Sequence, residues 1–296
     1  MKMTFRWYGK DDPVTLEKIR QIPKMTGIVS AVYSVPAGEV WPEEDIAGIK
    51  SAADKNGLAF EVVESVPVHE DIKLGAPGCD ELIEVYAENI RRLAKAGVKC
   101  VCYNFMPVFD WLRSELSRKL PDGSNALAYD NDTVLSLDPV TSDLSLPGWD
   151  ESYSKDDLRA LIARYQDVGE RGLWENLGRF LSRVIPVCDE TGVNMAIHPD
   201  DPPWGIFGLP RIITGRDSYE RMFGLAKSKS NGITLCTGSL GANPGNDLAE
   251  LCRRYSMEER IHFVHARNIL YTGERSFEES AHPTGCGSLD MYGIMK

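Results

Sequence analysis

Asn194-Met-Ala-Ile-His198 is a short apolar run that ends on an imidazole, and two later runs repeat the pattern: Gly232-Ile-Thr-Leu-Cys236 and Ile261-His-Phe-Val-His265. Each run has the length of a β-strand, and the three final residues lie 38 and 29 residues apart. These spacings are close to one strand, one helix and two loops. We therefore predict that the three side chains come from consecutive parallel strands at the mouth of an α/β barrel, where such barrels place their active sites.

Predicted strands and helices also alternate along the rest of the sequence. Four earlier apolar runs bounded by turn residues are predicted strands, at residues 3–8, 28–33, 59–64 and 99–105. Helical patterns follow at residues 14–21, 43–55, 80–95, inside 155–190, and at 217–226, 247–255 and 289–296. The alternation predicts a TIM (β/α)8-type barrel formed by residues 1–296 as a single domain. Seven strands are predicted, so the eighth strand is expected to be missing from this sequence.

One interval breaks the alternation. Residues 107–149 contain Pro-Asp-Gly, Asp-Asn-Asp and Leu-Pro-Gly-Trp, which are turn signals without helical or strand periodicity. A long loop in a compact domain usually serves a function. We expect residues 106–154 to form a lid over the barrel mouth, with a plain surface excursion or a subunit contact as the alternatives.

Composition excludes several classes of partner. The net charge of −11, without a cluster of Lys and Arg, argues against nucleic acid and anionic membrane surfaces. No stretch approaches the about 20 apolar residues of a membrane span, and the N-terminus lacks the apolar core of a signal peptide. The seven scattered cysteines are not typical of a disulfide framework. We expect a cytoplasmic protein in which Cys236 is available as a thiolate.

The three strand-end side chains suit a metal. Two imidazoles and a thiolate bind borderline divalent ions such as Mn²⁺, Fe²⁺, Co²⁺ or Zn²⁺, and three protein ligands leave positions open for a substrate. A single strand histidine or cysteine is more often a core residue, but three at successive strand ends favour a site at His198, Cys236 and His265. His262 points to the opposite side of its strand from His265, because side chains alternate along a strand.

Polar and aromatic residues flank the predicted ligands at the ends of the strands. Cations, amides, hydroxyls and aromatic faces in such positions are typical of a site for a polyhydroxy acid. The candidates for substrate binding are Arg6, Trp7, Asn104, Asp200, Ser239, Arg267 and Asn268. Asp200 and Asp201 are also candidates to orient the imidazole of His198, with capping of the turn as the alternative role. His69, after the third predicted strand, is the candidate for proton transfer or for orienting a substrate hydroxyl.

Several longer motifs together resemble the mannonate dehydratase family. They are Phe5-Arg-Trp-Tyr-Gly9, Glu64-Ser-Val-Pro-Val-His69, Cys102-Tyr-Asn-Phe-Met-Pro107, Leu146-Pro-Gly-Trp149, Ala196-Ile-His-Pro-Asp-Asp-Pro-Pro203, Leu235-Cys-Thr-Gly-Ser-Leu-Gly241 and Val264-His-Ala-Arg-Asn268. The resemblance implies a xylose-isomerase-like TIM barrel that binds Mn²⁺ or a similar ion through His198, Cys236 and His265. It also implies conversion of the sugar acid D-mannonate to 2-keto-3-deoxy-D-gluconate in hexuronate degradation. We expect a homo-oligomer, with a dimer favoured.

The given sequence ends at Lys296, before the point where members of that family end. Family members continue into an eighth strand with an Arg-Pro-Asp-His-Gly-Arg motif, whose aspartate is the fourth metal ligand and whose histidine, with a later tyrosine, carries acid/base chemistry. The resemblance thus places the acid/base residues beyond Lys296. Two alternatives to a working dehydratase therefore stay open. One is a metal-dependent sugar isomerase or epimerase on the same barrel, although such sites favour carboxylate ligands. The other is an impaired chain that only binds a metal or a sugar acid.

Overall fold

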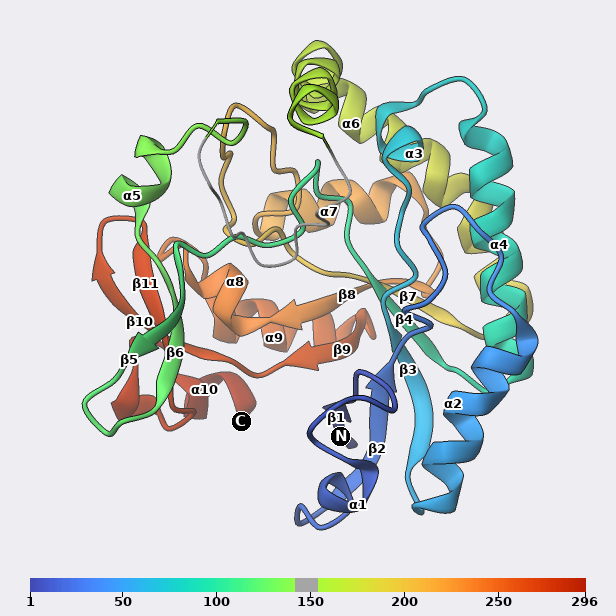
Figure 1. Ribbon diagram of the computed structural model, residues 1–296, viewed down its shortest axis with the longest axis horizontal. Helices are drawn as coiled ribbons and strands as arrows, with labels where there is room; N and C mark the ends of the chain where they lie inside the picture. Colours follow the sequence, from blue (N-terminus) through green and yellow to red (C-terminus); the bar gives the residue numbers. More distant parts are fainter. Residues whose placement is uncertain (142–153) are drawn as a thin grey trace.

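A computed structural model describes residues 1–141 and 154–296 (Figure 1). Its larger sheet is parallel throughout, with the strand order β1-β2-β3-β4-β7-β8-β9. These strands are β1 (Met3–Arg6), β2 (Met25–Ser30), β3 (Ala59–Glu64), β4 (Cys100–Tyr103), β7 (Asn194–Ile197), β8 (Asn231–Cys236) and β9 (Ile261–His265). The seven predicted strands are all present, and the predicted barrel class is confirmed. Sequence analysis placed the start of β2 three residues late, at residue 28 instead of Met25.

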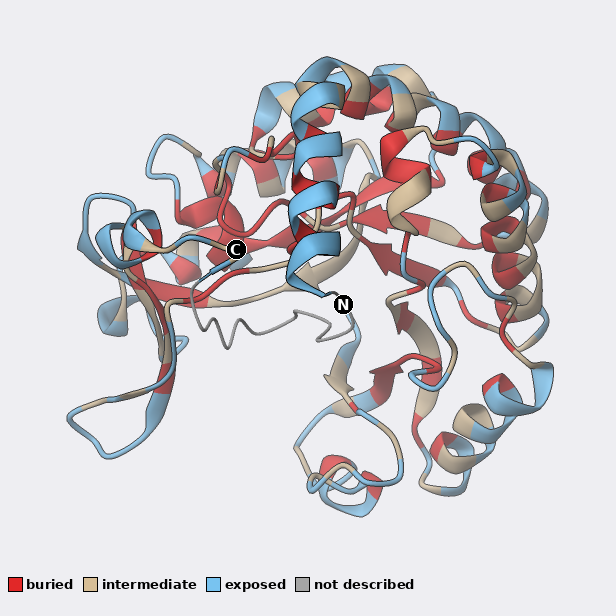
Figure 2. Ribbon diagram, turned by 45° about the horizontal axis from the view of Figure 1, so that its top comes forward, coloured by how far each residue is buried: buried red, intermediate tan, exposed pale blue. Residues whose placement is uncertain are grey.

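Helices cover the outer face of this sheet (Figure 1). The longer helices on this face are α2 (Glu43–Lys55), α4 (Cys79–Lys95), α6 (Lys155–Thr191), α7 (Arg216–Leu225) and α9 (Leu248–Met257). Shorter helical segments follow or precede the strands: α1 (Leu16–Ile19), α3 (Glu70–Leu74), α8 (Thr237–Gly241), α10 (Met291–Met295) and a 3-10 turn at Thr284–Cys286. In α4, Ile83, Tyr86, Ile90 and Leu93 are buried at the three- and four-residue spacing of one helical stripe. Figure 2 shows the result, with buried residues facing the sheet and exposed residues facing outward.

The barrel wall is open along one side. Within residues 1–141 and 154–296, β1 pairs only with β2, and β9 pairs only with β8. A closed eight-stranded barrel needs a further strand between these two edges. The described sheet therefore corresponds to a barrel that lacks one strand, as the sequence predicts.

A second, antiparallel sheet lies beside the barrel, in the order β10-β11-β6-β5. It joins β10 (Asn268–Gly273) and β11 (Ser276–Ser280) to β5 (Glu115–Lys119) and β6 (Asn125–Tyr129), which lie far away in the sequence (Figure 1). The prediction that residues 107–149 lack regular structure is wrong, since this segment contains β5, β6 and helix α5 (Asn131–Ser136). Residues 142–153, which include part of the expected lid, lie outside the described residues.

No helix in the described part of the chain combines the length and the apolar character that a membrane span needs.

Candidate metal centre and active site

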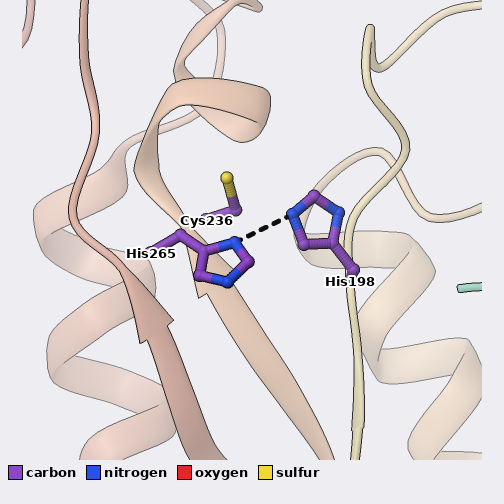
Figure 3. A group of neighbouring side chains, drawn as sticks. All are labelled: His198, Cys236 and His265. Atoms are coloured by element: carbon purple, nitrogen blue, oxygen red, sulfur yellow. Dashed lines mark hydrogen bonds between the residues drawn. The ribbon is translucent and has the colours of Figure 1, made fainter. Parts of the chain in front are cut away.

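His198, Cys236 and His265 meet at one point of the structure (Figure 3). Cys236 and His265 end β8 and β9, and His198 directly follows β7. Because adjacent parallel strands end at the same edge of the sheet, the three side chains converge there. Their ligand atoms all lie within 4.8 Å of one another, and His198 Nε2 is 3.2 Å from His265 Nδ1. The structure thus brings together the three side chains that the sequence singles out.

The outer nitrogen of each imidazole has an acceptor. His198 Nδ1 lies 2.6 Å from the carbonyl oxygen of Pro199, and His265 Nε2 lies 3.2 Å from Glu64 Oε2. Both acceptors call for a hydrogen on the outer nitrogen, which leaves the lone pairs of His198 Nε2 and His265 Nδ1 facing the shared centre. Metal-binding histidines are commonly held in this way, by a carboxylate or a carbonyl on the other nitrogen.

The charges around Cys236 and His265 favour the binding of a positively charged ion between these side chains. Burial opposes ionisation of Cys236, but the guanidinium of Arg267 and the imidazoles of His198 and His265 outweigh it and hold the pKa of the thiol well below its usual value. Burial also opposes protonation of His265, yet contacts with Cys236 and Glu64 raise its pKa to about 9. This raised pKa describes His265 without a metal. A borderline divalent ion would take the place of the proton on Nδ1, and an anionic sulfur and two imidazole lone pairs would then hold it.

A second group of side chains, Glu64, Cys102 and His265, also has ligand atoms within 4.8 Å of one another. Burial, followed by the charge of Glu64, raises the pKa of Cys102 well above its usual value, so this thiol stays neutral. A neutral thiol is a poor metal ligand. Glu64 instead forms ion pairs with His265 and with Arg6, whose Nη1 lies 2.9 Å from the carboxylate. The first group is therefore the better metal centre.

A pocket of about 290 Å³ opens beside the two histidines, close to the lower limit of about 300 Å³ for typical ligand sites. Its lining combines cations, carboxylates, amides and aromatic rings. The residues are Arg6, Tyr8, Glu64, Ser65, Cys102, Tyr103, Asn104, Met106, Asp110, Trp111, Leu127, His198, Asp201, His265 and Arg267. Of the predicted substrate-binding residues, Arg6, Asn104 and Arg267 are in this lining.

The other four predicted substrate-binding residues are buried outside it. Trp7 packs in the hydrophobic core. Asp200 accepts the backbone N–H of Ile213 at 2.9 Å, and burial raises its pKa to about 6. The acceptor for His198 is the carbonyl of Pro199, so Asp200 does not take the orienting role expected for it.

Ser239 and Asn268 are also absent from the lining. Ser239 lies next to Cys236, with Oγ 3.1 Å from Sγ. Asn268 donates to the carbonyls of Ala281 and Pro283 at 3.0 and 3.1 Å, and so holds the chain that follows β11. Both side chains stabilise the surroundings of the pocket.

His69 lies away from the metal centre. Its Nδ1 accepts the backbone N–H of Asp71 at 3.1 Å and caps the short helix α3. The ring lines a separate hollow with Gly38 and Leu82. The proton-transfer role of His69 therefore finds no support in its position.

Lys296 also lies outside the pocket lining. It is exposed and follows the last turn of α10, where its backbone N–H donates to the carbonyl of Tyr292 at 3.1 Å. The acid/base residues that the resemblance places beyond Lys296 are therefore not among the described residues.

Sequence analysis missed three pocket carboxylates. Glu64 ends β3 as Cys236 and His265 end their strands, so the same strand-end pattern contained it. Asp201 is visible in the Asp-Asp pair after His198 but was considered there only as an imidazole acceptor or a turn cap. Asp110 lies in the segment that was expected to be irregular, and no sequence signal marks it.

Comparisons with known proteins agree with this geometry. The profile of the D-mannonate dehydratase (UxuA) family matches residues 1–296. The mannonate dehydratase of Streptococcus uberis is 57% identical over 296 residues, which cover 100% of this chain and 85% of the relative. "Mannonate dehydratase 2" of Halalkalibacterium halodurans is 52% identical, with 100% and 86% covered.

Two solved structures resemble this chain, one closely and one in its fold alone. The crystal structure of mannonate dehydratase from Streptococcus suis serotype 2 matches with a TM-score of 0.92 and 47% identity, over 99% of this chain and 80% of that one. A D-psicose 3-epimerase from Clostridium cellulolyticum H10 matches with a TM-score of 0.54 at 14% identity, which shows the shared barrel fold alone. Because both the family profile and the high-identity relatives span its whole length, this chain belongs to the mannonate dehydratase family.

Proposed function

We propose that this chain is a hydro-lyase that converts D-mannonate to 2-keto-3-deoxy-D-gluconate and water, in hexuronate degradation. The observation that carries the proposal is the convergence of His198, Cys236 and His265 beside a polar pocket, in a chain of this family. The three residues are the proposed ligands of Mn²⁺, with Fe²⁺, Co²⁺ or Zn²⁺ as the alternatives that the same donor atoms accept.

The reaction explains why such a site is needed. Dehydration removes a weakly acidic proton from C2, next to a carboxylate, and expels a hydroxyl group from C3, which is a poor leaving group. When bound, a divalent ion supplies Lewis-acid stabilisation of the negative charge that develops on the substrate. The protein must bind and orient the sugar acid and move the protons.

Two arginines are suited to orient the substrate carboxylate, because a guanidinium binds a carboxylate through two parallel hydrogen bonds. Arg6 is held by Glu64 and by Tyr33, whose hydroxyl oxygen accepts from Nε at 3.1 Å. Arg267 is held by Asp201 at 2.7 Å. Both side chains are thus fixed in place in the pocket lining, and the amide of Asn104 adds a partner for a substrate hydroxyl.

Asp110 is the proposed group for proton exchange with a substrate hydroxyl. Among the described residues it forms no salt bridge, whereas Glu64 and Asp201 in the same lining are paired with arginines. Burial, opposed in part by Lys73, raises the pKa of its carboxyl. A raised pKa favours the protonated form of a carboxyl group, which is the form that can donate a proton. This assignment replaces His69, which lies outside the lining.

The proposal extends to the organisation of the protein. Residues 1–296 are proposed to form one barrel domain, with residues 106–154 covering the mouth. This idea is supported by Asp110, Trp111 and Leu127, which come from that segment and line the pocket. We also propose a cytoplasmic location and a homodimer.

The test is an assay of the purified chain with D-mannonate and Mn²⁺, with detection of the 2-keto-3-deoxy product. Formation of that product supports the proposal. A ketose or an epimeric sugar acid as product would favour an isomerase or epimerase instead. Binding of D-mannonate measured by calorimetry without any product would identify an impaired chain.

A further inference from the structure

Ser239 is a fully buried polar side chain next to the proposed metal ligand Cys236. It lies on the short helix α8, which directly follows β8. Its Oγ is 3.1 Å from Cys236 Sγ and 3.0 Å from Asp201 Oδ2, and it accepts from Arg267 Nη2 at 3.0 Å. The hydroxyl has a single hydrogen, so it can donate to the sulfur or to the carboxylate, but not to both at full strength.

Asp201 already has other donors. Arg113 Nη1 donates to Oδ1 at 2.8 Å, and Arg113 Nη2 and Arg267 Nη2 donate to Oδ2 at 3.0 and 2.7 Å. Charge-assisted hydrogen bonds from guanidinium groups are stronger than a bond from a neutral hydroxyl. Asp201 is therefore satisfied without the hydrogen of Ser239.

The sulfur of Cys236 has fewer hydrogen-bond donors than the carboxylate of Asp201. With a metal held by His198 Nε2 and His265 Nδ1, neither imidazole has a hydrogen for the sulfur. The hydroxyl of Ser239 is then the hydrogen-bond donor that the described residues offer to Sγ. A buried anionic sulfur gains most from such a bond, because no water competes for it.

A buried cluster fixes Ser239 in this orientation. Arg113 and Arg267 flank Asp201, and Glu279 of β11 lies 3.4 and 3.2 Å from their Nη2 and Nη1 atoms. The side chain of Arg113 is 0% exposed, and that of Asp201 is 2% exposed. The cluster therefore connects the loops after β7 and β9 to the antiparallel sheet.

We propose that Ser239 is a positioning residue that donates its hydroxyl hydrogen to the Cys236 thiolate, held in place by the cluster of Arg113, Asp201, Arg267 and Glu279. The inference rests on the proposed metal role of Cys236. It assigns Ser239 to the metal centre, in place of the substrate-binding role that the sequence suggested. Removing such a partner of a metal ligand typically lowers metal affinity about 10- to 100-fold.

The experiment compares cobalt-loaded wild-type protein with Ser239→Ala and Ser239→Gly. Both variants remove the hydroxyl but change the packing differently. The readouts are the energy of the thiolate-to-Co²⁺ charge-transfer absorption band and the dissociation constant for Co²⁺. Without the hydrogen bond the sulfur is a stronger electron donor, so the band should move to longer wavelength in both variants, and Co²⁺ should bind about tenfold more weakly.

The matched control is Ser30→Ala. Ser30 is also fully buried, and its hydroxyl donates to the carbonyl of Trp7 at 2.7 Å, away from the pocket lining. This variant should lose similar stability but keep the wild-type band and affinity. An unmoved band with unchanged Co²⁺ affinity in either folded Ser239 variant overturns the inference alone. Absence of a thiolate-to-Co²⁺ band in the wild-type protein overturns the metal role of Cys236 as well, and so distinguishes failure of the proposed function.

Discussion

The two sheets of this protein differ in how their strands find partners. In the parallel sheet, neighbours such as β8 and β9 are separated only by helices α8 and α9, and their ends carry the proposed metal ligands Cys236 and His265. In the antiparallel sheet, β6 pairs with β11, with Ala128 opposite Glu278. The first sheet shows the local alternation of a barrel, whereas the second is assembled from two distant insertions. The candidate metal centre lies on the first sheet, but one of the charges near it, Glu279, comes from the second.

The largest expected effect concerns the connection between the two sheets. Arg113→Met should lower the free energy of unfolding by about 3–5 kcal/mol, because it leaves the buried Asp201 with an incomplete set of partners. Arg118→Met is the control, since Arg118 also pairs with β11, through Glu278 at 3.4 Å, but is 31% exposed and should cost about 1 kcal/mol or less. Urea unfolding measures both, and equal costs would show that the buried cluster does not tie the sheets together.

The second prediction tests the parallel sheet as the origin of the metal centre. Cys236→Ser should weaken metal binding by more than about 100-fold, beyond the range for residues that only support a ligand, since a hydroxyl replaces an anionic sulfur. Elemental analysis after dialysis against graded chelator measures the retained metal. Cys286→Ser changes an exposed cysteine and should retain the wild-type content. Equal metal content in the two variants would remove Cys236 from the site.

The third prediction concerns substrate binding at the end of β1. Arg6→Lys should weaken D-mannonate binding about tenfold, because an ammonium cannot reproduce the two parallel hydrogen bonds of a guanidinium. Calorimetry in the presence of the metal gives the dissociation constant. Arg20→Lys alters an exposed arginine and serves as the control. If Arg6→Lys binds the sugar acid as tightly as the wild type, the carboxylate lies elsewhere in the pocket.

The smallest effect is expected in the antiparallel sheet. Leu127 of β6 lines the pocket, so bound D-mannonate should slow amide hydrogen exchange in residues 125–129 by a severalfold factor. The outer helix α2 provides an internal reference whose exchange should not change. Identical exchange of β6 with and without the sugar acid would argue against closure of residues 106–154 over the mouth.

The two sheets also differ in how much of the site the sequence predicts. His198, Cys236 and His265 were found because apolar runs and their spacing are local features of the sequence, although Glu64 ends β3 in the same way and was missed. Asp110 and Glu279 were missed because their positions depend on the fold of the segment after β4 and on β11. Trp7, Asp200 and Asn268 were placed at the right strand ends, but the direction of a side chain there depends on its packing neighbours, and all three turn into the protein interior.

The sequence by itself determined the barrel class, the convergence of His198, Cys236 and His265, and the family. The first two follow from short apolar runs whose order along the chain sets their order in a parallel sheet, and the family follows from the longer motifs that surround those runs. Only the tertiary structure decided that residues 115–129 form strands beside β11, and that Arg113 and Glu279 reach the surroundings of Cys236. Those contacts join residues separated by more than a hundred positions, and no local pattern encodes which distant charges will neutralise each other once both are buried.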